Sequence, residues 1–487
     1  MNFAILAYII GYVLKIESAL LLLPGFVGLY YGEDQAKAYF VVAAATLLAG
    51  IILSFKRPSD QAFYAREGLV SVALSWIAMS FFGCMPFVIS GDIPRFADAF
   101  FEIVSGFTTT GSSILSDVEA LSHCSLFWRS FSHWIGGMGV LVFMLTLFPI
   151  DGAAMHIMRA ESPGPQVGKI MPKMKDTSKA LYIIYSAMTV LEFVVLLACG
   201  VTPFDAVTTS FATAGTGGFA IYNSGFADYT HSAQYVVAVF MLLFGVNFSV
   251  YFLLIKRHFR QALKNEELKW YGVIVASAVV LITISTRTMF NLADAFRHAF
   301  FQVASIITTT GFSSTDFNLY PSFAKQIIMM LMFIGACAGS TGGGIKVSRI
   351  TILAKSFWNE LARLVHPRTV KKVRFEGKLV EHTTIRMVNV YLVAYIFVYV
   401  ASLLIISLDD FGMNTNFSAV AATINNIGPG LGTVGPTGNF GGFSDLSKYI
   451  FCFDMIAGRL EIFPMLVLLS PHTWHQTIRH RKTANNQ

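Results

Sequence analysis

The stretch Phe101-Glu-Ile-Val-Ser-Gly-Phe-Thr-Thr-Thr-Gly111 returns 200 residues later as Phe301-Gln-Val-Ala-Ser-Ile-Ile-Thr-Thr-Thr-Gly311. The two stretches share their first phenylalanine, their serine and the closing Thr-Thr-Thr-Gly. Each begins with an apolar segment that is compatible with a helix and ends in threonine and glycine, which favour a helix less. We interpret the repetition as two copies of one unit, a short helix followed by an irregular turn.

A weaker copy lies between these two stretches, at Phe204-Asp-Ala-Val-Thr-Thr-Ser-Phe-Ala-Thr-Ala-Gly-Thr-Gly-Gly218. Asp98 precedes Gly111 by 13 residues, and Asp205 precedes Gly218 by the same distance. This shared spacing aligns the two glycines and makes the stretch a second copy in chain order.

The fourth copy is Phe417-Ser-Ala-Val-Ala-Ala-Thr-Ile-Asn-Asn-Ile-Gly-Pro-Gly430. Its first four residues resemble the start of the second copy, Phe204-Asp-Ala-Val. That match brings Gly430 onto Gly218 only if one residue is skipped. Gly428 is the alternative partner of Gly218 in this alignment.

The composition is that of a membrane protein. Of 487 residues, 55% are hydrophobic and 13% are charged, whereas soluble domains carry about 25% charged residues. Mean hydropathy is +0.61. The N-terminus lacks the basic start and cleavage site of a signal peptide, so residues 3–31 are expected to form the first span. Further apolar runs long enough to span a membrane include Leu69–Ile89, Leu126–Phe148, Tyr182–Cys199, Tyr235–Ile255 and Val388–Ile406.

Basic residues gather in alternate loops, which predicts the orientation of the chain. Twenty-six of the 35 lysines and arginines lie in residues 56–67, 151–180, 256–269, 346–386 and 479–482. The opposite loops, which contain the four copies, hold five. Because basic loops stay cytoplasmic, both termini are expected in the cytoplasm and the number of spans is expected to be even. The alternation also argues against nucleic-acid binding as the reason for the basic balance.

The copies recur at intervals too long for a solenoid repeat. They fit a unit of span, pore loop and span, and four such units plus two N-terminal spans give ten. We therefore predict an all-α integral membrane protein with four pseudo-fourfold repeats around one central pore. The expected segments are 1–67 (two N-terminal spans), 68–150, 151–260 and 261–360 (the first three repeats), and 361–487 (the fourth repeat and tail).

Thr-Gly runs at membrane depth suit a dehydrated cation. Such backbone is tolerated there only where protein buries it or it lines a water-filled cavity. Four runs around one axis would present carbonyl oxygens that replace the hydration shell of potassium, and the negative C-terminal ends of the preceding helices would favour the cation. Small residues can instead serve helix packing, but four copies in register with the spans favour the ion path. Its expected ligands are Thr109, Thr110, Gly111, Thr216, Gly217, Gly218, Thr309, Thr310, Gly311, Gly428, Pro429 and Gly430.

Three further motifs strengthen this interpretation: Ala338-Gly-Ser-Thr-Gly-Gly-Gly-Ile-Lys346, Asn425-Asn-Ile-Gly-Pro-Gly-Leu-Gly432 and Gly458-Arg-Leu-Glu-Ile-Phe463. With the glycine runs, they resemble the TrkH type of the bacterial Trk/Ktr/HKT superfamily of potassium transporters. The resemblance covers nearly the whole chain. It implies potassium uptake across a bacterial inner membrane, with potassium as the transported ion and no organic cofactor in this chain.

The resemblance also implies selectivity and partners. In this family a serine at the first filter position accompanies sodium permeation, and Gly111 at that position implies potassium. A homodimer with one pore per subunit is expected. The dimer would assemble on a cytosolic ring of TrkA-type proteins that bind nucleotides such as NAD or ATP. The basic residues of 363–386 would contact either anionic lipid or that partner.

The segment Ala338–Gly344 interrupts an expected span with four glycines in seven residues. It should break the helix and remain mobile, because glycine carries the largest backbone entropy. It is not a phosphate-binding loop, since Ile345 occupies the lysine position of that motif. By resemblance it is a gate below the filter. The expected gate residues are Gly339, Ser340, Thr341, Gly342, Gly343, Gly344, Lys346 and Arg459.

Charged residues inside spans usually mark a pathway or a buried pair. Arg459 is either a positive charge near the pore that raises the barrier to cations or the partner of Asp454 or Glu461. Glu102 and Glu192 are interpreted as structural, because Gln302 replaces Glu102 in the third copy and no fourfold carboxylate ring forms.

Two transport mechanisms stay open. All four copies face outward, which favours a channel-like path over the inverted repeats of many transporters. Symport of potassium with protons or sodium is the alternative. No HExxH or GxSxG motif lies on the spans, and the five cysteines form no CxxC pair, so neither an enzyme nor a zinc site is expected.

Overall fold

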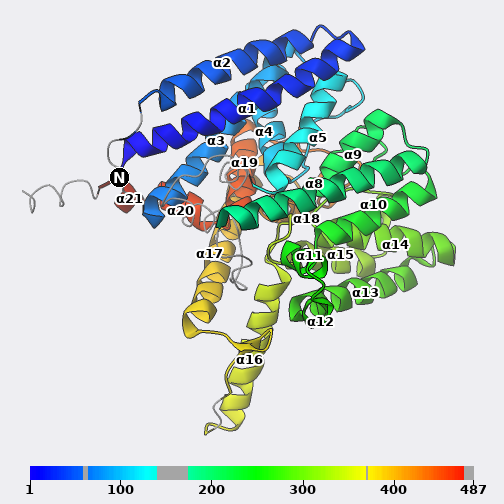
Figure 1. Ribbon diagram of the computed structural model, residues 1–487. Coiled ribbons are helices and arrows are strands. Elements are labelled where there is room, and N and C mark those ends of the chain that lie inside the picture. Colours follow the sequence, from blue (N-terminus) through cyan, green and yellow to red (C-terminus); the bar gives the residue numbers. More distant parts are fainter. Residues whose placement is uncertain (57, 59–63, 140–173, 369–370, 476–487) are drawn as a thin grey trace, which may run out of the picture.

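The computed structural model of the 487-residue chain describes residues 1–56, 58, 64–139, 174–368 and 371–475. The described chain is mostly helical and has one two-stranded hairpin (Figure 1). The end of the expected span Leu126–Phe148 and most of the basic segments 151–180 and 479–482 lie outside the described residues.

The N-terminal helices α1 (Phe3–Tyr31) and α2 (Ala36–Ser54) pack against each other along one side of the molecule (Figure 1). A Cβ atom on Gly11 of α1 would lie 2.8 Å from the Gly50 carbonyl oxygen of α2. Small residues at such a contact let two membrane helices approach closely. The first helix agrees with the expected span of residues 3–31.

Six helices of the described chain are long and apolar enough to cross a membrane. A seventh candidate joins two helices that bend by 91° at the break between them, α10 (His231–Phe244) and α11 (Phe248–Ile255). The sequence predicted ten spans; the helices that follow the four copies are shorter or interrupted and fall outside this length criterion. Besides α1 and α2, the six are α3 (Ala65–Ser90), α8 (Met174–Ala198), α13 (Glu266–Thr286) and α17 (His382–Ile406).

A short helix follows each of four long ones and leads into one of the four copies. Local sequence starts two of them: the Thr202 side chain caps the second, with Pro203 in its first turn, and Asn291 caps the third. Each ends three or four residues before its glycine. The short helices are α4 (Phe96–Phe107), α9 (Pro203–Gly215), α14 (Leu292–Ile307) and α18 (Met413–Ile424).

The largest apolar core joins α1, α3, α4, α5, α18 and α19, and includes the buried Trp76 and Trp128.

After each copy the chain turns back along a further helix, and turns of 3-10 helix lie in the connections after two of the copies. The returning helices are α5 (His123–Gly137), α10, α15 (Ser322–Ile334) and α19 (Asp445–Arg459); the 3-10 turns are η1 (Phe317–Leu319), η2 (Ser407–Asp409) after α17, and η3 (Gly432–Val434).

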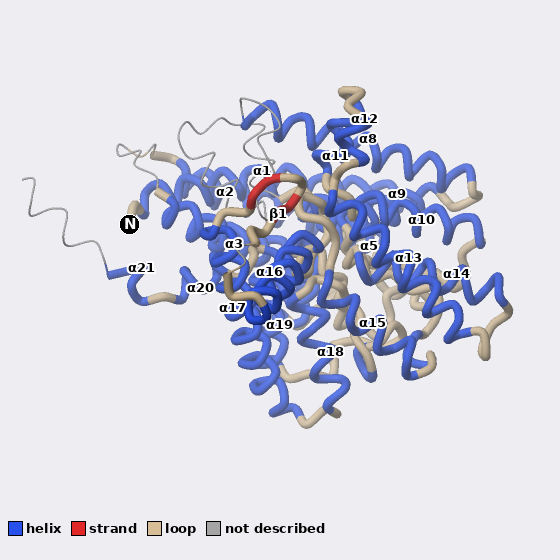
Figure 2. The backbone as a smooth tube through the Cα atoms, turned by 90° about the horizontal axis from the view of Figure 1, so that it is seen from below, coloured by secondary structure: helices blue, strands red, loops and turns tan. Residues whose placement is uncertain are grey.

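Helix α16 (Val347–Val365) extends away from the helical body at the bottom of Figure 1. Beside it lies the hairpin of β1 (Arg374–Phe375) and β2 (Lys378–Leu379), drawn red in Figure 2. Glu376 and Gly377 both have positive φ at its turn. The remaining elements are short: α12 (Phe259–Leu263), α20 (Phe463–Leu469) and α21 (Pro471–His475).

Candidate functional site

The four copies share one backbone conformation. In each, a residue other than glycine adopts a left-handed φ between 54° and 59°, and a glycine two positions later has φ between 77° and 103°. Left-handed backbone costs an L-residue roughly 1–2 kcal/mol, and such strain gathers at functional sites. The pairs are Thr109 with Gly111, Thr216 with Gly218, Thr309 with Gly311, and Asn426 with Gly428.

These four glycines, each together with the residue before it, form a closed ring. We call it the glycine ring. A Cβ on a glycine would meet the carbonyl oxygen of the residue before the next copy's glycine. The contacts run in one direction around the ring. A Cβ on Gly111 would overlap the oxygen of Gly217, one on Gly218 that of Thr310, and one on Gly311 that of Ile427, while one on Gly428 would lie 3.0 Å from that of Thr110.

In the fourth copy, the backbone favours Gly428 over Gly430, the two glycines that the sequence alignment left as alternatives. Gly428 has the matching backbone and contact, whereas Gly430 packs against Ser418 outside the ring. Aligning Gly428 with Gly218 displaces the apolar match Phe417-Ser-Ala-Val by three residues. That is nearly one helical turn, so the matched side chains still share a helix face. The expected ligands Thr109–Gly111, Thr216–Gly218, Thr309–Gly311 and Gly428–Pro429 do come together.

Threonine hydroxyls brace the first and third copies in the same way. Thr108 and Thr110 share a hydroxyl–hydroxyl hydrogen bond of 2.8 Å, and Thr308 and Thr310 share another of 2.8 Å. These side chains are fully buried. The C-terminal ends of the short helices lie within four residues of the ring glycines, so their partial negative charge favours a cation there. Among the described residues, no group of three His, Cys, Asp or Glu side chains could hold a metal ion.

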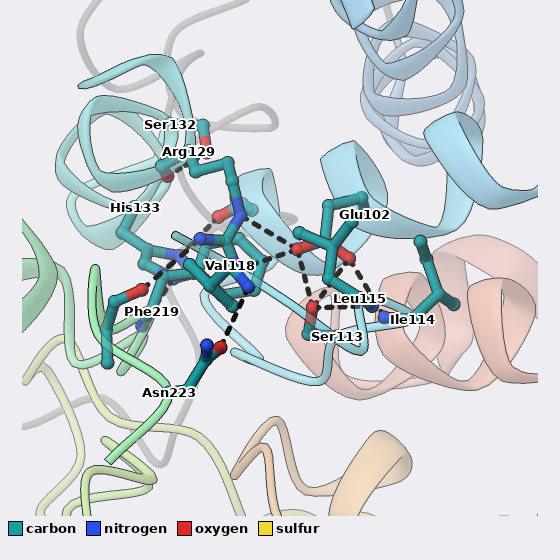
Figure 3. Close-up of polar contacts among 12 residues, drawn as sticks. Glu102, Ser113, Ile114, Leu115, Val118, Arg129, Ser132, His133, Phe219 and Asn223 are labelled. Carbon is teal, nitrogen blue, oxygen red and sulfur yellow. Dashed lines mark hydrogen bonds and ion pairs between the residues drawn. The ribbon is translucent and has the colours of Figure 1, made fainter. Parts of the chain in front are cut away.

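A buried ion pair supports the first copy from behind (Figure 3). Glu102 of α4 accepts a hydrogen bond from Arg129 of α5 at 2.8 Å, and both side chains are at most 2% exposed. The Glu102 carboxylate also accepts from the Ser113 hydroxyl at 2.9 Å and from the Ile114 backbone N–H at 3.1 Å. The structural interpretation of Glu102 is thus supported, because its carboxylate fixes the backbone just after Gly111.

The same support reaches the second copy. Arg129 lies over the Phe219 ring, with its guanidinium carbon 4.1 Å from the ring centre, and donates to the Ala220 carbonyl oxygen at 3.3 Å. The buried His133 accepts from the Phe219 backbone N–H through Nε2 at 3.2 Å. Its Nδ1 must then carry the proton and donate to the Gly106 carbonyl oxygen at 2.8 Å (Figure 3). Arg129 and His133 therefore join the first two copies.

Residues 335–346, here called the glycine-rich break, separate α15 from α16 as the sequence predicted. Two of its glycines lie close to the third and fourth copies. A Cβ on Gly342 would lie 2.8 Å from the Thr308 carbonyl oxygen, and one on Gly343 would overlap the Asn425 carbonyl oxygen. The Gly343 N–H donates to the Thr309 hydroxyl at 2.6 Å. The break therefore lies directly against the third and fourth copies.

The break also contacts the bend between α10 and α11. The Phe248 N–H donates to the Gly339 carbonyl oxygen at 3.0 Å, and the Cys337 N–H donates to that of Gly245 at 3.1 Å. Within the break, Ser340 donates to the Cys337 carbonyl oxygen at 2.7 Å. Two interrupted helices thus satisfy part of each other's backbone hydrogen bonding.

Arg459, at the end of α19, joins the break to α5. Its Nη1 donates to the Thr341 carbonyl oxygen at 2.8 Å. Its Nη2 donates to the carbonyl oxygens of Gly136 and Gly137 at 2.5 and 2.6 Å.

The acids considered as partners of Arg459 bind elsewhere. Asp454 accepts from the Ser402 hydroxyl at 2.6 Å, and Glu461 pairs with Arg349 of α16. Lys346 is buried and donates to the Gly342 carbonyl oxygen within the break.

Sequence reasoning missed several residues of this region. Asn426 occupies the left-handed position of the fourth copy; the run Asn425-Asn426 could have signalled it, because asparagine tolerates that conformation. Arg129 and His133 carried no signal, because their partners are far away in the sequence.

Comparisons with known proteins agree with this architecture. A family model, TrkH, described as a cation transport protein, matches residues 35–476. The Trk system potassium uptake protein TrkH of Salmonella typhimurium is 35% identical over 98% of this chain and all of its own length. TrkH of Escherichia coli K12 is 34% identical with the same coverage, and TrkG of that strain is 31% identical over 96% of this chain and 98% of its own.

A solved structure matches almost as fully. The crystal structure of the potassium transporter TrkH from Vibrio parahaemolyticus superposes with a TM-score of 0.88 at 33% identity, covering 97% of this chain and all of that one. Family model, relatives and structure span the same regions that hold the glycine ring and the break. The chain belongs to the TrkH family of cation transport proteins, which are transporters and not enzymes.

Proposed function

We propose that this chain takes up potassium across a bacterial inner membrane through the glycine ring. The observation that carries the proposal is the closed cycle of four left-handed glycines, each against the carbonyl oxygen of the next copy. Such a cycle brings backbone oxygens from four segments to one axis, where they can replace the hydration shell of potassium. The names of the relatives, potassium uptake proteins, support the choice of ion.

In this proposal the selectivity filter comprises Thr109–Gly111, Thr216–Gly218, Thr309–Gly311 and Asn426–Pro429. The four short helices are pore helices, and each copy with its flanking helices is one repeat. With α1 and α2, these repeats make ten passes, several of them interrupted. Both termini face the cytoplasm.

The glycine-rich break is the proposed gate. It lies against the third and fourth copies, and Arg459 and Lys346 add positive charge on that side of the ring. Positive charge beneath a cation path raises the barrier to permeation. Opening then requires the break to move away from Thr309 and Asn425.

The proposed assembly is a homodimer on a cytosolic TrkA-type ring that binds nucleotides. The end of α16, which carries Arg363, extends from the body on the side expected to face the cytoplasm, and the hairpin with Arg374 and Lys378 lies beside this helix (Figure 1). The basic stretch 363–386 is the proposed docking region, with anionic lipid as the other candidate contact. Symport with protons or sodium is the alternative mechanism.

Ion flux into proteoliposomes tests the proposal. Potassium and rubidium should enter faster than sodium and lithium. Gly111→Ser should lower total entry, because its Cβ would overlap the Gly217 carbonyl oxygen, and should raise the share of sodium in what still enters. Gly272→Ala is the matched control, because a Cβ on Gly272 meets nothing within 4 Å. Equal entry of all four ions in the unaltered protein would contradict the proposal. Reversal potentials measured against proton and sodium gradients separate a channel from a symporter.

A further inference from the structure

The first turn of α13 carries a buried carboxylate that contacts both ends of the glycine-rich break. One oxygen of Glu267 accepts from the Ala338 backbone N–H at 2.7 Å and from the Ser348 backbone N–H at 3.0 Å. The side chain is fully buried. Ala338 lies near the start of the break and Ser348 just after its end, so this oxygen joins two points ten residues apart in the chain.

The second contact replaces a missing helix cap. Helix α16 begins at Val347, and its N-cap residue, Lys346, has a φ of 59° and makes no side-chain cap bond. The first backbone N–H groups of a helix need a partner, and a carboxylate there also interacts favourably with the helix dipole. Glu267 meets this need for Ser348 from another helix.

The preceding residues of α13 extend the connection toward the hairpin. Glu266 pairs with Lys355 of α16 and accepts from the Glu376 backbone N–H at 3.1 Å. The Asn265 side chain donates to Glu376 at 2.6 Å. One short stretch of α13 therefore holds the hairpin, the body of α16 and the break.

We propose that Glu267 is a positioning residue that holds the break in its closed arrangement. When α16 and the hairpin shift relative to α13, the hydrogen bond between Glu267 and Ser348 is lost. The glycine-rich break is then free to move away from the glycine ring. This inference rests on the proposed gate function of the break. It assigns the coupling between the cytosolic elements and the gate to one carboxylate.

The experiment compares Glu267→Gln and Glu267→Ala in proteoliposomes without any regulatory subunit. Alanine removes both hydrogen bonds, whereas glutamine keeps a neutral acceptor of the same size. Rubidium entry should rise in the order unaltered protein, Gln, Ala, with a rise of at least about tenfold for Ala, because losing even one hydrogen bond to a charged group has roughly that effect and alanine loses two. Glu17→Gln is the matched control, another fully buried glutamate on α1; it should leave entry unchanged.

Hydrogen exchange supplies a readout that does not depend on flux. Peptides covering residues 336–350 should exchange faster in both Glu267 variants and not in Glu17→Gln. If Glu267→Ala fails to fold, Glu267→Gln decides the result. Unchanged exchange, or faster exchange without faster rubidium entry, would overturn the role of Glu267.

A variant shortened within Gly339–Gly344 separates this outcome from failure of the gate itself. If the shortened protein admits rubidium faster and the Glu267 variants do not, Glu267 is not the holding residue and the gate proposal stands. If shortening leaves entry unchanged as well, both the gate and this inference fail.

Discussion

The glycine ring and the glycine-rich break are both irregular backbone inside the helical body, yet they are held differently. The ring is held mainly by backbone, with each glycine against a carbonyl oxygen of the next copy. The break has backbone contacts too, but it is also held by charged side chains from other helices, namely Arg459 and Glu267. The near-fourfold symmetry of the ring follows from a backbone conformation that all four copies share. The break, which occurs in the third repeat alone, depends on single side chains.

The ring itself is not uniform in its support. The first copy has the buried pair of Glu102 with Arg129, while the third has the neutral Gln302, which donates to the Thr315 carbonyl oxygen at 3.2 Å. An ion pair that joins two copies should fix them more firmly than one amide within a copy.

The largest expected effect comes from adding a side chain to the ring. Gly218→Ala would place a Cβ onto the Thr310 carbonyl oxygen and force alanine into a φ of +77°. The left-handed backbone alone costs roughly 1–2 kcal/mol, and the overlap with a backbone oxygen adds to that cost, so potassium uptake should fall by far more than about tenfold. Uptake by cells that lack other potassium systems measures this. Unaltered uptake would show that backbone contact does not hold the ring.

The next effect concerns the pair behind the first copy. Glu102→Gln gives this copy the residue of the third and leaves Arg129 buried without its carboxylate. Removing one partner of a buried pair costs about 3–5 kcal/mol, measurable as a lower Tm in detergent. The double variant Glu102→Gln with Arg129→Leu should recover part of the loss. If the single variant melts like the unaltered protein, the two copies are supported equally.

Arg459→Ala should have a smaller effect, and in the opposite direction. It releases the contacts to Thr341, Gly136 and Gly137. Potassium entry without a regulatory subunit should rise by only about tenfold, roughly the effect of one charged hydrogen bond, because only the Thr341 contact is to the break and the break's other contacts remain.

Arg459→Lys distinguishes the two roles of this residue, because lysine keeps the charge without the planar fork. Low entry with lysine would assign control to charge, and raised entry would assign it to the three contacts. Arg287→Ala, at an exposed position just after α13, is the control. If Arg459→Ala admits no more potassium than the unaltered protein, this single residue does not hold the break closed.

The smallest effect is expected for an exposed ion pair between the start of α4 and the start of α19. Arg95 and Asp445 form an exposed pair at 2.8 Å, close to the buried Lys448, which pairs with Asp98 at 2.5 Å. Arg95→Ala should change the free energy of unfolding by less than about 1 kcal/mol, because exposed pairs contribute little. A larger drop in Tm for Arg95→Ala than for Lys448→Met would reverse this ranking.

The sequence predicted the parts of the site that depend on local backbone. Three ring glycines follow from the repeated Thr-Gly runs, and the interruption after Ile334 follows from four clustered glycines. The sequence left open whether Gly428 or Gly430 aligns with Gly218, because the apolar match that favours Gly430 lies one helical turn away from the ring register. The contacts of Arg459 and Glu267 could not be predicted, since they join residues more than 70 positions apart and depend on how helices pack.

The one-way contacts of the ring bear on how its width is set. Each ring glycine lies so close to the backbone of the next copy that a Cβ would not fit at three of the four positions, so the diameter depends on all four segments. Gly428 is the least crowded of the four, because a Cβ there would lie 3.0 Å from the Thr110 carbonyl oxygen, a tight contact but not an overlap. The fourth segment, which differs most in sequence, is therefore also the one whose backbone approaches its neighbour least closely.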